Sequence, residues 1–112
     1  MSAKLVQENL IKSRTPHGMD DVCGRVEEAC KQQGFSLLAE IDLADKVRSK
    51  GVGLEGECRI FEFCSPQSAA TALKDNRDIA TLLPCRLAVY TEEEDGDTYI
   101  SSAAPTSLLA LI

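Results

Sequence analysis

Two short segments of the sequence carry the residue types best suited to chemistry, and each contains a cysteine. Cys64 ends a strand-like run directly before a helix start, and Cys85 begins the next strand-like run. If these two strands are antiparallel neighbours, both thiols lie at the same edge of the sheet and could form one site. The candidate binding residues at this edge are Cys64, Ser65, Pro66, Cys85 and Arg86.

The surroundings of both cysteines favour a thiolate. Cys64 stands one residue before the expected N-cap, near the positive end of a helix dipole, and Arg86 would act in the same direction if it turns inward. Two facing thiolates would bind a soft metal such as Cu(I) or Zn(II), or carry sulfur as a persulfide or a transient disulfide. A zinc site would need further ligands, and Cys58 lies too far along the strand to supply one. The alternative is that Cys64 and Cys85 are packed and inert.

Other titratable residues give weaker signals. Glu40 and Asp42 are two apart on an expected strand, so they share a face and could act as paired carboxylates. Asp42 is also the expected N-cap of the next helix, and Glu40 could simply be solvated. His17 lies in a Pro-His-Gly turn, where we expect it to be solvated. Because no phosphate loop or nucleophile elbow is present, an enzyme is the least supported class.

The elements that position these residues follow from hydrophobic spacing and from turn residues. Apolar positions from Met19 recur every three or four residues and end at Gly34, which predicts a helix with Cys23 and Cys30 on its buried stripe. Pro66 suits the first turn of a helix capped by Ser65. Strands are expected at residues 5–14, 35–41, 57–64, 85–91 and 98–102, and helical segments at 19–34, 43–51, 66–76 and 79–83.

These elements predict one α+β domain over residues 1–112, a two-layer sandwich. Its sheet is mainly antiparallel, with four or five strands and the helices packed on one face. The two helical pieces between residues 66 and 83 would run out from the sheet and back, which returns Cys85 to the edge that Cys64 left. Asp95-Gly96 predicts the hairpin between the last two strands, within an acidic turn that we expect to be solvated.

Charge and composition limit the partners. The chain has 112 residues and a formal net charge of −6, and it shows no basic stripe, so we expect no nucleic-acid partner. We see no signal peptide and no membrane-spanning run, and the odd number of five cysteines indicates reduced thiols, so a cytoplasmic protein is expected. The apolar residues near the end of the chain should dock on this domain or on a second copy: Leu108, Leu109, Leu111 and Ile112.

Several strings, taken in order, resemble the uncharacterised prokaryotic family called Domain of Unknown Function 302. They are Gly34-Phe35, Glu40-Ile41-Asp42-Leu43, Cys64-Ser65-Pro66-Gln67, Leu83-Pro84-Cys85-Arg86 and Val89-Tyr90. The resemblance implies a small α+β protein that forms a dimer, and it implies no activity. One position departs from the family pattern, because Ser65 stands where relatives commonly have Asn, and either side chain can cap a helix.

Two hypotheses follow from the sequence. The first is a small cytoplasmic homodimeric binding protein whose Cys64 and Cys85 edge binds a soft metal ion or carries a sulfur species. The alternative is a protein-interaction or small-ligand-binding module whose cysteines only pack and which has no chemistry of its own.

Overall fold

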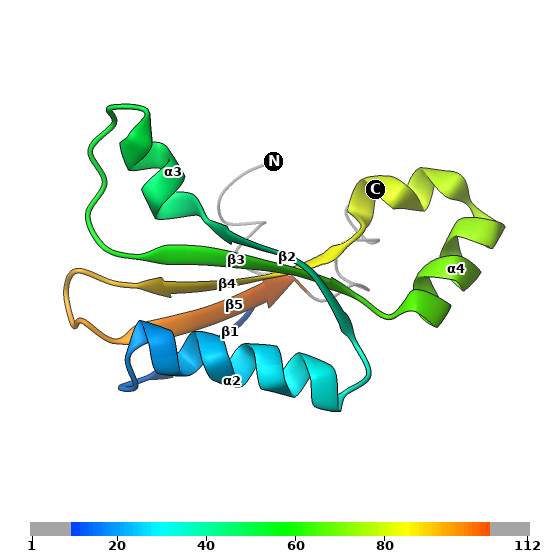
Figure 1. The fold of residues 1–112 in the computed structure, drawn as a ribbon, viewed down its shortest axis with the longest axis horizontal. Coiled ribbons are helices and arrows are strands. Elements are labelled where there is room, and N and C mark those ends of the chain that lie inside the picture. The colour runs from blue at the N-terminus through cyan, green and yellow to red at the C-terminus, as the bar shows by residue number, and fades with distance from the viewer. Residues whose placement is uncertain (1–9, 104–112) are drawn as a thin grey trace.

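A five-stranded antiparallel sheet is the centre of the computed structural model, which describes residues 10–103 (Figure 1). Its strands are β1 (Leu10–Thr15), β2 (Ser36–Asp42), β3 (Cys58–Cys64), β4 (Cys85–Thr91) and β5 (Thr98–Ala103). The helices are α2 (Met19–Gln32), α3 (Leu43–Ser49), α4 (Pro66–Asp75) and the 3-10 helix η1 (Arg77–Leu82). The strand order is β1-β5-β4-β3-β2, and every neighbouring pair is antiparallel. The predicted α+β sandwich is therefore confirmed.

Helix α2 forms the layer against the sheet, because its apolar residues lie on one stripe. The buried members of that stripe are Val22, Cys23, Val26 and Cys30. The helix ends at the predicted glycine: Gly34 has a φ of 78°, and the backbone then turns so that the N–H of Phe35 reaches the carbonyl of Cys30 at 2.9 Å. The packing role predicted for Cys23 and Cys30 is confirmed.

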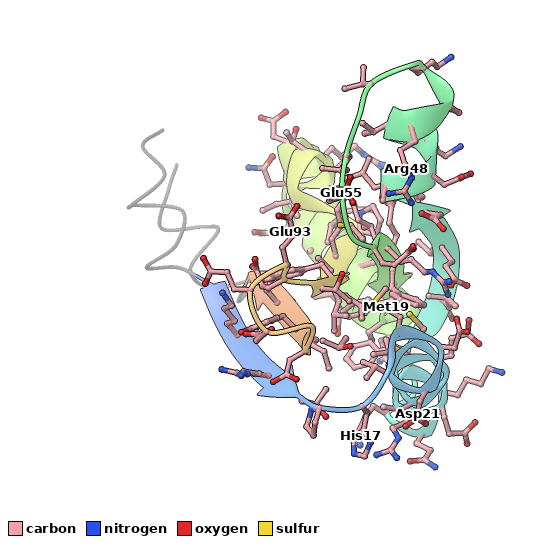
Figure 2. The ribbon with its side chains drawn as sticks, turned by 90° about the vertical axis from the view of Figure 1, so that its left-hand side faces the viewer. His17, Met19, Asp21, Arg48, Glu55 and Glu93 are labelled. Carbon is pink, nitrogen blue, oxygen red and sulfur yellow. The ribbon has the colours of Figure 1, made fainter. Side chains whose placement is uncertain are left out.

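The core lies between α2 and the middle of the sheet. Phe61 on β3 and Val89 on β4 are fully buried beneath the helix, with Leu37, Phe63 and Leu87 packed around them. Among the strands, α2 lies closest to β2 and β4, on either side of β3. The view along the strands shows β1 at the edge of the sheet that lies away from α2 (Figure 2). The helix therefore covers the β2–β4 side of the sheet and leaves the β5–β1 side less covered.

The connection between β3 and β4 runs out and back, as predicted. Helix α4 and η1 extend beyond one end of the sheet and return the chain to β4, the neighbour of β3 (Figure 1). Ser65 is the N-cap of α4 and Pro66 its first residue, although the Ser65 side chain makes no capping hydrogen bond. No residue of α4 is buried. Helix α4 packs against η1.

Further predictions concern the cap of α3, membrane-spanning segments and the apolar end of the chain. Asp42 caps α3, because its carboxylate accepts a hydrogen bond from the N–H of Asp45 at 3.0 Å. Within residues 10–103, no helix is long and apolar enough to span a membrane. The apolar residues 108–112, on which the docking prediction rests, lie outside the described residues.

Candidate functional site

The two cysteines of the predicted edge lie at the same end of neighbouring strands. Cys85 pairs with Phe63 across β3 and β4, so it is diagonal to Cys64. Residues that pair directly share a face of the sheet, and consecutive residues alternate. Cys85 therefore shares the α2 face with Phe63, whereas Cys64 belongs to the opposite face. The structure brings the two backbone positions together and directs the two side chains apart.

Arg86 belongs to the face of Cys64 as well. It pairs with Glu62 in the sheet, and its Nε lies 3.8 Å from the Glu62 carboxylate. Cys64 and Cys85 are both half-buried free thiols. Within the described part of the chain, no group of three or more His, Cys, Asp or Glu side chains could hold a metal ion. Burial raises the pKa of the Cys23, Cys30 and Cys58 thiols, which disfavours their reactive thiolate form.

The predicted pair Glu40 and Asp42 meets at an arginine. Arg59 places its Nη1 3.9 Å from Glu40 Oε1, its Nε 3.8 Å from Asp42 Oδ2 and its Nη2 3.3 Å from Asp20 Oδ1. Burial and the neighbouring Glu27 raise the pKa of Glu40, while Arg59 opposes that shift. Since each carboxylate has a permanent cation beside it, this cluster joins α2 to β2 and β3 as an ion-pair network.

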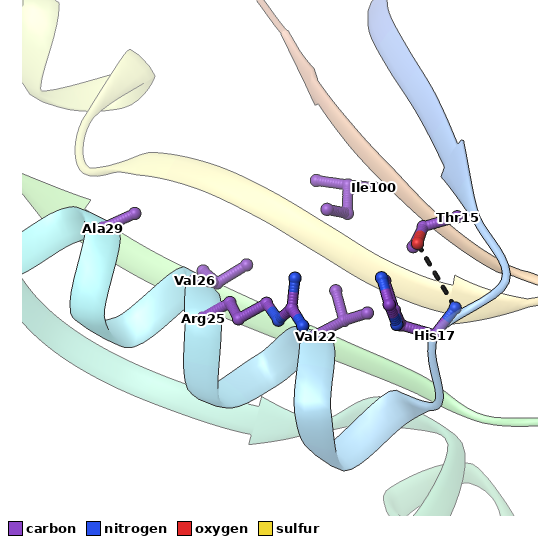
Figure 3. A pocket seen from close by; sticks show the side chains of 7 residues that line it. All are labelled: Thr15, His17, Val22, Arg25, Val26, Ala29 and Ile100. Carbon is purple, nitrogen blue, oxygen red and sulfur yellow. Dashed lines mark hydrogen bonds between the residues drawn. The ribbon is translucent and has the colours of Figure 1, made fainter.

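A cavity lies on the other side of α2, toward β5 and β1 (Figure 3). Its volume is about 310 Å³, which is at the lower end of the range for small-molecule sites. Its lining comes from the end of β1, the turn after it, α2 and β5: Thr15, His17, Val22, Arg25, Val26, Ala29 and Ile100. Four of these side chains are purely aliphatic, so the interior is mainly apolar and the polar groups are few.

Four hydrogen-bonding and ionic contacts organise the polar rim of the cavity. Asp21 accepts a hydrogen bond from Arg25 Nε at 3.1 Å and lies 3.6 Å from His17 Nδ1. The turn that carries His17 is tied to the sheet, because the buried Thr98 hydroxyl donates to the His17 carbonyl at 2.7 Å. The N–H of His17 also donates to Thr15 Oγ1 at 3.3 Å (Figure 3). One carboxylate therefore lies beside two basic side chains at the rim.

The arrangement is suited to binding. The cavity offers an apolar interior with two basic groups at its rim. Sequence reasoning placed His17 in a solvated turn and did not identify Arg25. The spacing of His17, Asp21 and Arg25, each four residues from the next, was the available signal, since such residues share one side of a helix and its N-terminal turn.

Two comparisons place the chain among known proteins, and a third found no match. A family model described as "Domain of unknown function DUF302" matches residues 11–112. The structure is similar to the crystal structure of an uncharacterized conserved protein DUF302 from Bacillus stearothermophilus, with a TM-score of 0.86 and 34% sequence identity. That match covers 92% of this chain and 79% of the other. No curated protein matches the chain.

Proposed function

The chain belongs to the DUF302 family, and we propose that it is a small homodimeric protein that binds a small ligand and has no chemistry of its own. The single observation that carries this proposal is the cavity of about 310 Å³ between α2 and β5. An apolar interior with a few polar groups at its rim is the usual composition of a small-molecule site. The free thiols suit a reducing compartment, and we place the protein in the cytoplasm.

Filling the cavity tests the proposal. Ala29 lines the cavity from an exposed position on α2, so Ala29→Phe adds a ring to the cavity without removing a core side chain. We expect the neutral fluorescent probe N-phenyl-1-naphthylamine to bind the native protein, and we expect Ala29→Phe to weaken that binding by at least about tenfold. Ala70→Phe is the matched control, because Ala70 is an exposed alanine of α4. Equal binding by both variants would contradict the proposal.

The thiol hypothesis stays a prediction with a direct test. Strand alternation gives Cys64 and Cys85 different neighbours, which supports the thiol-indifferent alternative. We therefore expect no pair of fast-reacting thiols when the native protein is treated with a disulfide reagent at neutral pH. Rapid modification of two thiols, abolished in the Cys64→Ser, Cys85→Ser double variant, would instead favour a site for Cu(I), Zn(II) or a sulfur species.

The proposed dimer is supported by the sheet face opposite α2. Its apolar side chains are half-buried, and they form a stripe across four strands: Ala39, Ile41, Ile60, Ala88 and Tyr90 together with Tyr99. Such a stripe is self-complementary when two copies meet about a two-fold axis.

Light scattering tests the dimer through Ile60→Lys on that stripe. The native protein should have the mass of two chains, and Ile60→Lys should have the mass of one. Ser68→Lys on the exposed surface of α4 is the control. A native protein with the mass of one chain would contradict the dimer.

A further inference from the structure

We propose that the ligand of the cavity is a small monocarboxylate with an apolar body, whose carboxylate is bound by Arg25 beside His17. This inference rests on the proposed function, because it assigns a chemical class to the ligand of the same cavity. Three observations support it. Arg25 has donors without a partner among the described residues, His17 lies at the same rim, and the rim is basic whereas the interior is apolar.

Arg25 keeps most of its hydrogen-bonding capacity for a ligand. Its Nε donates to Asp21 at 3.1 Å, whereas its two Nη groups have no hydrogen-bond partner among the described residues. The side chain is 63% exposed while it lines the cavity. The Nη edge of a guanidinium presents two parallel donors, which match the two oxygens of a carboxylate. A carboxylate at the rim would therefore be bound without breaking the contact to Asp21.

His17 forms another part of the same rim. Its ring and the Arg25 side chain both lie next to Val22, which belongs to the apolar lining (Figure 3). The Thr98 hydroxyl ties the His17 backbone to β5, so the turn that carries His17 is held before a ligand arrives, and Asp21 lies beside both basic groups. Such preorganisation lowers the entropy cost of binding.

The apolar lining of the cavity determines which chemical groups the rest of the ligand can carry. Beyond the rim, the lining consists of Val22, Val26, Ala29 and Ile100, which offer no donor or acceptor side chain. A hydrocarbon or aromatic body gains from contact with this surface, whereas a second charged group would be desolvated without a partner. A ligand with a single carboxylate at one end satisfies both the rim and the interior.

The test compares an acid with its neutral isostere. In competition with N-phenyl-1-naphthylamine near neutral pH, we expect 4-phenylbutanoate to bind at least about tenfold more tightly than 4-phenylbutan-1-ol. Arg25→Gln should remove that preference by weakening the acid and leaving the alcohol within about twofold. Arg77→Gln, on exposed η1, is the matched control and should keep the preference.

The outcomes separate the two proposals. Equal binding of the acid and the alcohol by the native protein would overturn the carboxylate inference and leave the ligand-binding function intact. An acid preference that persists in Arg25→Gln would overturn the assignment of Arg25. Failure of the probe, the acid and the alcohol to bind would overturn the proposed function and the inference together.

Discussion

The two long sides of α2 differ in how they use an arginine. On the side toward β2 and β3, Arg59 is 26% exposed and has three carboxylates within 3.9 Å. On the side toward β5, Arg25 is 63% exposed and has a single carboxylate, Asp21, at 3.1 Å. The guanidinium of Arg59 is already surrounded by protein carboxylates, so it has few donors left for a ligand. The second side keeps a fixed cation with unused donors next to an apolar cavity.

The widths of a helix and of a sheet explain this difference. Neighbouring strands lie about 4.8 Å apart, so five strands are about 19 Å wide, whereas a helix with its side chains is about 10–12 Å across. One helix can therefore cover only part of the sheet. Since α2 lies over β2 to β4, the inner face of β5 and β1 is left open to form the cavity. The position of α2 across the sheet thus decides which side is packed and which side has the cavity.

Phe61→Ala should have the largest effect, because it removes the fully buried ring on which α2 rests. Truncation of a buried Phe costs about 3–5 kcal/mol of the free energy of unfolding, to be measured by urea denaturation. The control is Phe35→Ala: Phe35 is 37% exposed and makes a T-shaped contact with the Phe63 ring. A similar loss for both variants would mean that α2 is not held mainly at Phe61.

Thr98→Val tests the open side of the helix. Valine keeps the shape of the buried threonine but removes the hydroxyl that donates to the His17 carbonyl, which leaves that carbonyl without this partner. The expected cost is about 1–3 kcal/mol in urea denaturation. Ser102→Ala, which removes an exposed hydrogen bond to the Arg86 carbonyl, should cost less. If Thr98→Val leaves stability and probe binding unchanged, the His17 turn does not depend on β5.

The comparison of the two arginines can be made with one substitution at both positions. Arg59→Met should cost about 1–2 kcal/mol, because it leaves Asp20, Glu40 and Asp42 close together without their shared cation. Arg25→Met should cost less than about 1 kcal/mol, as expected for one exposed pair. Thermal unfolding at equal protein concentration measures both. Equal losses would remove the distinction between a packed side and a binding side.

The fold could be predicted from the sequence because its signals are local. The spacing of Val22, Cys23 and Val26 shows the buried side of α2, Gly34 marks its end, and Asp42 caps α3. The out-and-back path from β3 to β4 also followed from turn and cap residues. Each of these features is decided by a few neighbouring residues, so the packing of the whole domain did not have to be known.

The site could not be predicted in the same way. Whether Cys85 faces Cys64 or Phe63 depends on a register shift of one residue, and no single strand encodes that shift. The cavity depends on where α2 lies across the sheet, and its lining comes from β1, a turn, α2 and β5. Ile100 and Arg25 are far apart in the sequence, and the four-residue spacing of His17, Asp21 and Arg25 does not point to β5. Only the tertiary arrangement brings them to one cavity.

Glu40→Gln should have the smallest effect on the free energy of unfolding, and that effect should depend on pH. Burial and Glu27 raise the pKa of Glu40 above its ordinary value of 4.5. Because the folded protein then binds this proton more tightly than the unfolded chain, the stability that Glu40 contributes is complete below pH 4.5. That stability is lost as the pH rises through the raised pKa.

Glu40→Gln should therefore flatten the decline of unfolding free energy just above pH 4.5, by less than about 1 kcal/mol because the side chain is 37% exposed. Urea denaturation at several pH values measures the curve, and Glu55→Gln on the exposed loop before β3 supplies the control curve. An unchanged slope in Glu40→Gln would mean that Arg59 compensates this carboxylate fully. Burial of Glu40 would then cost no stability on the packed side of α2. The difference between the Arg59 cluster and the single exposed ion pair of Arg25 would increase.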